Sequence, residues 1–175
     1  MNSLMSSQWH DFYILLGTAS AALVALLFVA VSVGASLISP ERSTATRTFM
    51  SPVVFHYSSI LLLSLIALIP NLTAAALAFA IALLAVVGMG YTTVVTVGLA
   101  RASISDVADR LGYGLFPLAA YLGILAAAGI AFVEMPLSAD ILAGSLLLLL
   151  AVNIRNAWDL LLAFARRIAT KRPGP

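Results

Sequence analysis

Five long apolar stretches, separated by short segments that carry the charges, constrain this chain more than any other feature of its sequence. A helix needs about 20 mainly apolar residues to cross a membrane, because each residue adds about 1.5 Å across a hydrocarbon core of about 30 Å. The stretches that meet this requirement lie at about 12–38, 52–69, 72–99, 113–133 and 139–160. We therefore predict an all-α membrane protein, in which one domain (residues 1–169) forms a bundle of five transmembrane helices.

The composition favours the same class of protein. Hydrophobic residues make up 62% of the chain and charged residues only 9%, whereas a soluble domain has about 25% charged residues. The net charge of +2 is too small to indicate nucleic-acid binding, and the absence of Cys excludes disulfides and cysteine-bound metals. Residues 1–11 lack the Lys or Arg of a signal peptide, so we expect the first stretch to be a spanning helix in contact with the lipid bilayer.

The basic residues fall on one side of the predicted bundle. Arg42 and Arg47 follow the first stretch, Arg101 and Arg110 follow the third, and Arg155, Arg166, Arg167, Lys171 and Arg172 lie near or beyond the end of the fifth. The opposite side carries Asp11, Glu134 and Asp140 and no Lys or Arg. Short loops rich in Lys and Arg stay in the cytoplasm. We therefore predict an outer amino terminus, a cytoplasmic carboxyl terminus and a disordered cytoplasmic tail at residues 170–175.

Two helix ends carry local signals. Ser39-Pro40-Glu41 has the residues of a helix start, so the second helix begins there and kinks at Pro52, or it begins at Ser51-Pro52 itself. Between the third and fourth stretches, residues 103–111 favour a short interfacial helix that Gly112 and Gly114 would end.

Small residues repeat every four positions on two of the predicted helices. They are Gly17, Ala21 and Ala25 on the first, and Gly123 and Ala127 on the fourth. Small residues at this spacing allow helix backbones to approach closely in lipid. We expect these contacts to form within one chain.

The sequence lacks the usual marks of an enzyme or a metal site. The two His residues, His10 and His56, belong to opposite membrane faces, and no HExxH motif is present. Gly88-Met89-Gly90 is not followed by the Lys-Ser/Thr of a phosphate-binding loop, so we predict close helix contacts there instead. We expect no catalytic residue, no cofactor and no metal.

A set of polar residues lies toward the cytoplasmic half of the bundle. The candidate patch consists of His56, Tyr57, Tyr91, Asn153, Arg155, Asn156 and Asp159. On a helix, Asn153 and Asn156 share a face that Asp159 would continue, and Arg155 and Asp159 can pair at a spacing of four. Polar residues inside lipid often mark function, and here they would bind an ion, a lipid headgroup or a small solute.

The alternative is structural, with Arg155 at the membrane interface beside Trp158 and with His56 hydrogen-bonded to a neighbour.

Two functions follow from this patch. The first is a self-associating bundle that forms a conduit or binding site for ions or small solutes. The alternative is an accessory subunit that binds another membrane protein without transport or catalysis. A conduit predicts that His56, Asn153 and Asn156 face a shared wet cavity. An accessory subunit predicts that they are hydrogen-bonded within one chain while a face of small residues stays exposed.

Three segments carry a resemblance to a known group of proteins: Trp9-His10-Asp11-Phe12, Gly17-Thr18-Ala19-Ser20-Ala21-Ala22-Leu23 with Leu27-Phe28-Val29-Ala30, and Asn153-Ile154-Arg155-Asn156-Ala157-Trp158-Asp159-Leu160. They resemble small, mostly uncharacterised bacterial inner-membrane proteins, some of which are labelled as modulators of the membrane-anchored AAA protease. The resemblance covers the first and fifth helices. It implies a location in the bacterial cytoplasmic (inner) membrane and assigns no catalytic residue.

Overall fold

The computed structural model describes residues 7–34, 43–101, 107–133 and 137–171, and all the secondary structure in these ranges is helical. The elements are α1 (Ser7–Gly34), α2 (Ser43–Ala67), α3 (Ala74–Arg101), α4 (Val107–Arg110), the π-helical turn η4 (Leu111–Leu115), α5 (Phe116–Ala131) and α6 (Leu137–Lys171). The predicted all-α class is therefore confirmed.

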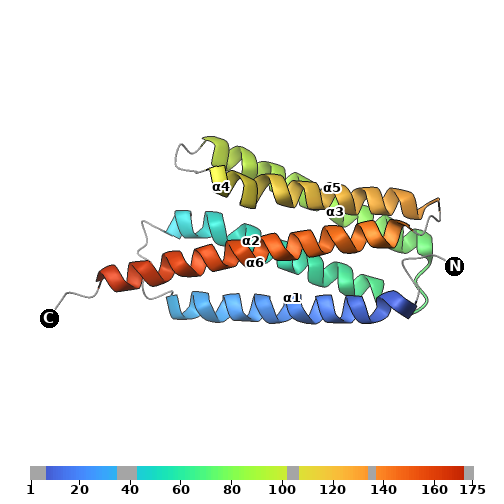
Figure 1. Ribbon diagram of the computed structural model, residues 1–175, viewed down its shortest axis with the longest axis horizontal. Coiled ribbons are helices and arrows are strands. Elements are labelled where there is room, and N and C mark those ends of the chain that lie inside the picture. The colour runs from blue at the N-terminus through green and yellow to red at the C-terminus, as the bar shows by residue number, and fades with distance from the viewer. Residues whose placement is uncertain (1–6, 35–42, 102–106, 134–136, 172–175) are drawn as a thin grey trace.

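Four of these helices are long and apolar enough to cross a membrane. The segments that qualify are Trp9–Ala30, Ala74–Arg101, Leu111–Ala131 and Leu137–Leu162. The apolar part of α2, Ser51–Ala67, is shorter, although α2 lies along the same axis as the other helices (Figure 1). The structure thus supports a multi-pass membrane protein, and the fifth crossing stays a prediction.

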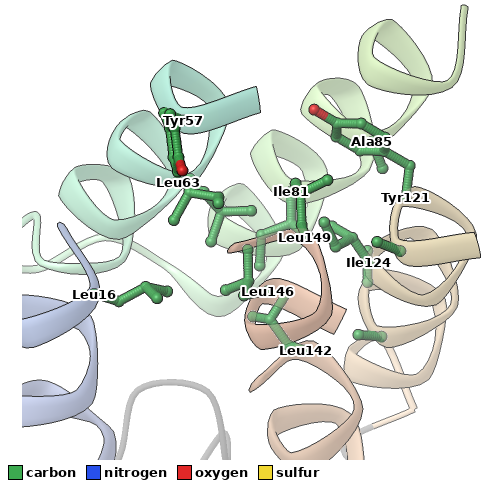
Figure 2. Close-up of a cluster of buried hydrophobic side chains, with 14 of the residues drawn as sticks. Leu16, Tyr57, Leu63, Ile81, Ala85, Tyr121, Ile124, Leu142, Leu146 and Leu149 are labelled. Carbon is green, nitrogen blue, oxygen red and sulfur yellow. The ribbon is translucent and has the colours of Figure 1, made fainter. Parts of the chain in front are cut away.

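The long helices form three layers. α2 and α6 contact each other in the middle, with α1 packed on α2 at one side and the α3–α5 pair at the other (Figure 1). The core lies mainly between α2, α3, α5 and α6, where aliphatic side chains such as Ile81, Ile124 and Leu146 meet (Figure 2). Because α1 contacts α2 and little else, it lies at the edge of the bundle.

Three helix ends differ from the sequence expectations. α2 is helical from Ser43 and contains Pro52, so a start at Ser51-Pro52 is wrong; the earlier start at residues 39–41 lies outside the described residues. Gly112 and Gly114 do not end a helix, because α4 continues without a break into η4 and α5. α6 continues to Lys171, past the predicted end at Leu160, and residues 172–175 lie outside the described part.

The charges are separated in space as they are in sequence. Arg101 and Arg110 are the last residues of α3 and α4, and Arg155 lies in the middle of α6 beside Gly112 of η4, whereas Asp11 and Asp140 lie in the first turns of α1 and α6. Arg42 and Glu134 lie outside the described residues.

The small residues pack partly as expected. A side chain on Gly17 would meet Ser64 of α2 at 3.1 Å, and a side chain on Gly123 would overlap Ser145 of α6. Ala127 is buried as well, whereas Ala21 and Ala25 are exposed. Close packing within the chain is therefore confirmed for Gly17, Gly123 and Ala127, while the rest of the α1 stripe faces outward.

Candidate functional site

The structure divides the predicted polar patch into an inner and an outer group. His56, Tyr57, Asn153 and Asn156 are buried between helices. Tyr91 is partly buried, and Arg155 and Asp159 lie outside the core with side chains 51% and 52% exposed. The seven residues therefore do not line one shared site.

His56 makes the central contact of the inner group. Its Nδ1 lies 2.9 Å from the hydroxyl of Tyr121, a buried hydrogen bond that joins α2 to α5 and in which the imidazole tautomer decides the donor. The other ring nitrogen, Nε2, is buried without a hydrogen-bond partner among the described residues. Aromatic rings surround the imidazole: Phe55 meets it edge-on at 5.6 Å and stacks on Tyr91 at 4.1 Å.

A glycine on α3 makes room for this contact. Gly88 is buried, and any side chain there would overlap the ring of Tyr121. Since Tyr121 reaches His56 across this position, the glycine fixes where the tyrosine hydroxyl lies. The close helix contact predicted for the Gly88–Gly90 segment is confirmed at Gly88, whereas Gly90 is exposed and has open space around it.

A second polar contact joins α6 to the π-helical turn, and the sequence explains why the turn forms. Proline has no N–H, and its ring clashes with the carbonyl four residues earlier in an α-helix, so Pro117 disfavours regular α-geometry just before it. The N–H of Phe116 bonds to the carbonyl of Leu111, five residues back, which is the π pattern. Pro117 also lacks the N–H that would continue this pattern to the carbonyl of Gly112.

The carbonyl of Gly112 is instead satisfied by a side chain. Asn156 donates from Nδ2 to this oxygen at 2.9 Å, and the hydroxyl of Tyr113 donates to the backbone carbonyl of Asn156 at 3.3 Å. The first contact requires a glycine, because a Cβ at position 112 would lie 2.7 Å from Oδ1 of Asn156. Asn156 and η4 thus form a reciprocal clamp between α6 and the start of α5.

The outer group consists of exposed polar contacts. The predicted pair of Arg155 and Asp159 is confirmed, with 3.8 Å between Nη2 and Oδ2. Trp158 lies on the same outward side and is 61% exposed. Tyr91 donates to the hydroxyl of Ser51 at 3.0 Å near the beginning of the apolar part of α2.

The core next to His56 and Tyr121 is closely packed. A cavity of about 10 Å³ lies beside Tyr121 and has an apolar lining that includes Ile60, Leu84 and Leu149. This volume is about the least that holds one water molecule, and such a water needs polar partners. This cavity, which is lined by described residues, is therefore too small to let a solute pass.

Comparisons with family models, with curated proteins and with solved structures gave no match to this chain. Within the described ranges, no group of three or more His, Asp or Glu side chains is placed to hold a metal ion.

The residues that complete both contacts were not part of the predicted patch. Tyr121 was missed because a tyrosine within an apolar helix gives no local sign of a partner 65 residues away. Gly112 was assigned to a helix end, although Pro117 five residues later was a usable sign that its carbonyl would lack a backbone donor.

Proposed function

We propose that this chain is an accessory subunit that binds another membrane protein through the outer face of α1 and that neither transports a solute nor catalyses a reaction. The observation that carries this proposal is the use of the polar patch inside the chain. His56 bonds to Tyr121 and Asn156 to Gly112, so these buried polar residues serve to hold helices of one chain together.

The exposed side of α1 favours a partner helix over a purely structural role. Thr18, Ala21, Ala22 and Ala25 are all exposed on this helix, and small residues allow two helix backbones to approach closely in lipid. Because α1 packs mainly on α2, this surface remains open along the edge of the bundle. The resemblance of the first and fifth helices makes the membrane-anchored AAA protease the first partner to test.

The proposed topology has five crossings, with the amino terminus outside and the carboxyl terminus in the cytoplasm of a bacterial inner membrane. Support for the fifth crossing comes from α2, whose 25 residues span about 37 Å at about 1.5 Å each. Support for the orientation comes from Arg101 and Arg110, which end α3 and α4, and from Arg155, which lies beside the adjoining turn η4, since basic residues favour the cytoplasmic side.

The test is purification of the chain with its partner from its own membranes in mild detergent, followed by native mass spectrometry. The Ala21→Leu and Ala25→Leu variants place bulk on the outer face of α1 and should reduce the stoichiometric partner. Ala126→Leu adds the same bulk at an exposed position of α5 and should retain it. Equal retention by all three variants, or no stoichiometric partner for the unaltered chain, would contradict the proposal.

A conduit formed between several copies is the second candidate. It is favoured by the outward position of Arg155 and Asp159, because charged side chains at the surface of one copy would line a pore between copies. A pure homo-oligomer in the same mass spectra, with ion flux into liposomes that Asp159→Asn alters, would support the conduit over the accessory subunit.

A further inference from the structure

The guanidinium of Arg155 on α6 lies beside the π-helical turn η4. Its Nη1 lies 3.2 Å from the position that a Cβ on Gly112 would occupy, so its guanidinium rests beside the π-helical turn where no side chain intervenes. Half of the side chain remains exposed. The same glycine that admits Asn156 therefore also places the guanidinium at the surface.

The hydrogen-bonding capacity of Arg155 is mostly unused among the residues that the structure describes. Asp159 is its partner among the described residues, and the 3.8 Å between nitrogen and oxygen is too long for a hydrogen bond. A guanidinium has five N–H donors arranged to grip carboxylate or phosphate. An anion from outside the chain would therefore gain contacts that Asp159 does not provide.

The surroundings of Arg155 match a membrane interface. Trp158 is exposed on the same side of α6, and Trp is enriched where lipid headgroups meet hydrocarbon. Arg110 is exposed two residues before Gly112, at the end of α4. Phosphate groups of lipids are the anions present at a membrane surface, and basic pockets between membrane helices bind anionic headgroups.

We propose that Arg155, assisted by Arg110, binds the headgroup phosphate of an anionic phospholipid at the junction of α6 and η4, with Trp158 against the adjoining glycerol and upper acyl chain. This lipid site goes beyond the partner-binding role and requires only that this end of the bundle lies at a membrane surface. In this arrangement Asp159 competes with the lipid for Arg155, so removing its charge strengthens lipid binding.

The opposite response of two neighbouring charges distinguishes this site from a structural ion pair. If Arg155 serves only to pair with Asp159, neutralising either residue breaks the same contact and leaves lipid binding unchanged. If Arg155 binds phosphate, Arg155→Gln weakens binding and Asp159→Asn increases it. Asp106 and Asp109 are close to Arg110 in the sequence and add negative charge to the same region. The test therefore neutralises one residue at a time, so that an effect of net charge can be separated from an effect of one side chain.

The experiment is native mass spectrometry of the purified full-length chain titrated with phosphatidylglycerol, with phosphatidylcholine as the neutral lipid. We expect preferential retention of phosphatidylglycerol, about a tenfold loss of this retention with Arg155→Gln, and a gain with Asp159→Asn. Arg101→Gln removes an exposed positive charge from α3 at the same end and should cause little change. Thermal unfolding in detergent verifies that each variant remains folded.

Equal retention of the two lipids, a loss with Asp159→Asn, or the same loss with Arg101→Gln as with Arg155→Gln would overturn the site. Because the purified chain is measured without any protein partner, this outcome is independent of the α1 surface and its test.

Discussion

Replacing Gly88 by Ala tests whether the fit between α3 and Tyr121 holds the bundle together. The added methyl group would overlap the ring of Tyr121, whose hydroxyl bonds to His56. The tyrosine must then move, and α3 must shift away or the hydrogen bond to α2 must break. Gly90, two residues further along the same helix, has open space around it and provides a matched control.

The expected loss in the free energy of unfolding is about 2 kcal/mol. Overpacking a well-packed core costs about 1–3 kcal/mol, and the lost hydrogen bond costs about 0.5–1.5 kcal/mol. Alanine offsets about 0.5–1 kcal/mol of this, because it favours the helix over glycine. Gly90→Ala retains only the last contribution, so it should leave the stability unchanged or raise it slightly.

The assay is reversible unfolding in mixed detergent micelles with increasing SDS, followed by the fluorescence of Trp9 and Trp158. A double-mutant cycle with Tyr121→Ala identifies the contact: once the ring is removed, adding the methyl group at position 88 should no longer cost stability. If Gly88→Ala is as stable as Gly90→Ala, or if its cost persists without the Tyr121 ring, the proposed contact between α3 and α5 is refuted.

Two further predictions concern the polar contacts themselves. Tyr121→Phe keeps the ring but leaves His56 without its partner and should cost about 1–2 kcal/mol of unfolding free energy; Tyr91→Phe, which loses an exposed hydrogen bond, should cost less than half as much in the same SDS titration. Gly112→Ala should lower the free energy of unfolding by about 1–3 kcal/mol, because its Cβ would lie 2.7 Å from Oδ1 of Asn156. Hydrogen exchange of the backbone amides at residues 111–115 should become faster in this variant, and unchanged exchange would contradict the clamp.

The helical class and four of the apolar spans were predictable because hydropathy over about 20 residues is a local property. The start of α2 was less clear, because Pro52 has the same local signature at a helix start and inside a membrane helix. Proline is tolerated within membrane helices where neighbouring groups satisfy the freed carbonyl. Sequence therefore left two alternatives for α2, and the helical residues from Ser43 to Pro52 exclude the later start.

For the candidate site, the sequence predicted which residues share a face of one helix, α6, but not which residues of other helices they contact. Asn153 and Asn156 are both buried, as their spacing of three suggested. Asp159 was expected to continue this face, yet it is exposed. Each step of three residues falls about 60° short of a full turn, so two steps rotate the side chain by about 120° and out of the core. Contacts between helices, such as that of His56 with Tyr121, depend on how the helices pack and leave no local signal.

The π-helical turn also matters for how related chains should be aligned. Its bond pattern takes one residue more than an α-helical turn, and one residue corresponds to about 100° of rotation. A single helical wheel drawn through residues 107–131 would therefore misplace Arg110 relative to the buried stripe of α5. We expect that relatives differing by one residue in length will have the insertion or deletion at 111–115, because converting the π-helical turn into an α-helical turn removes one residue and rotates α4 relative to α5, while α5 keeps its own packing on α3 and α6.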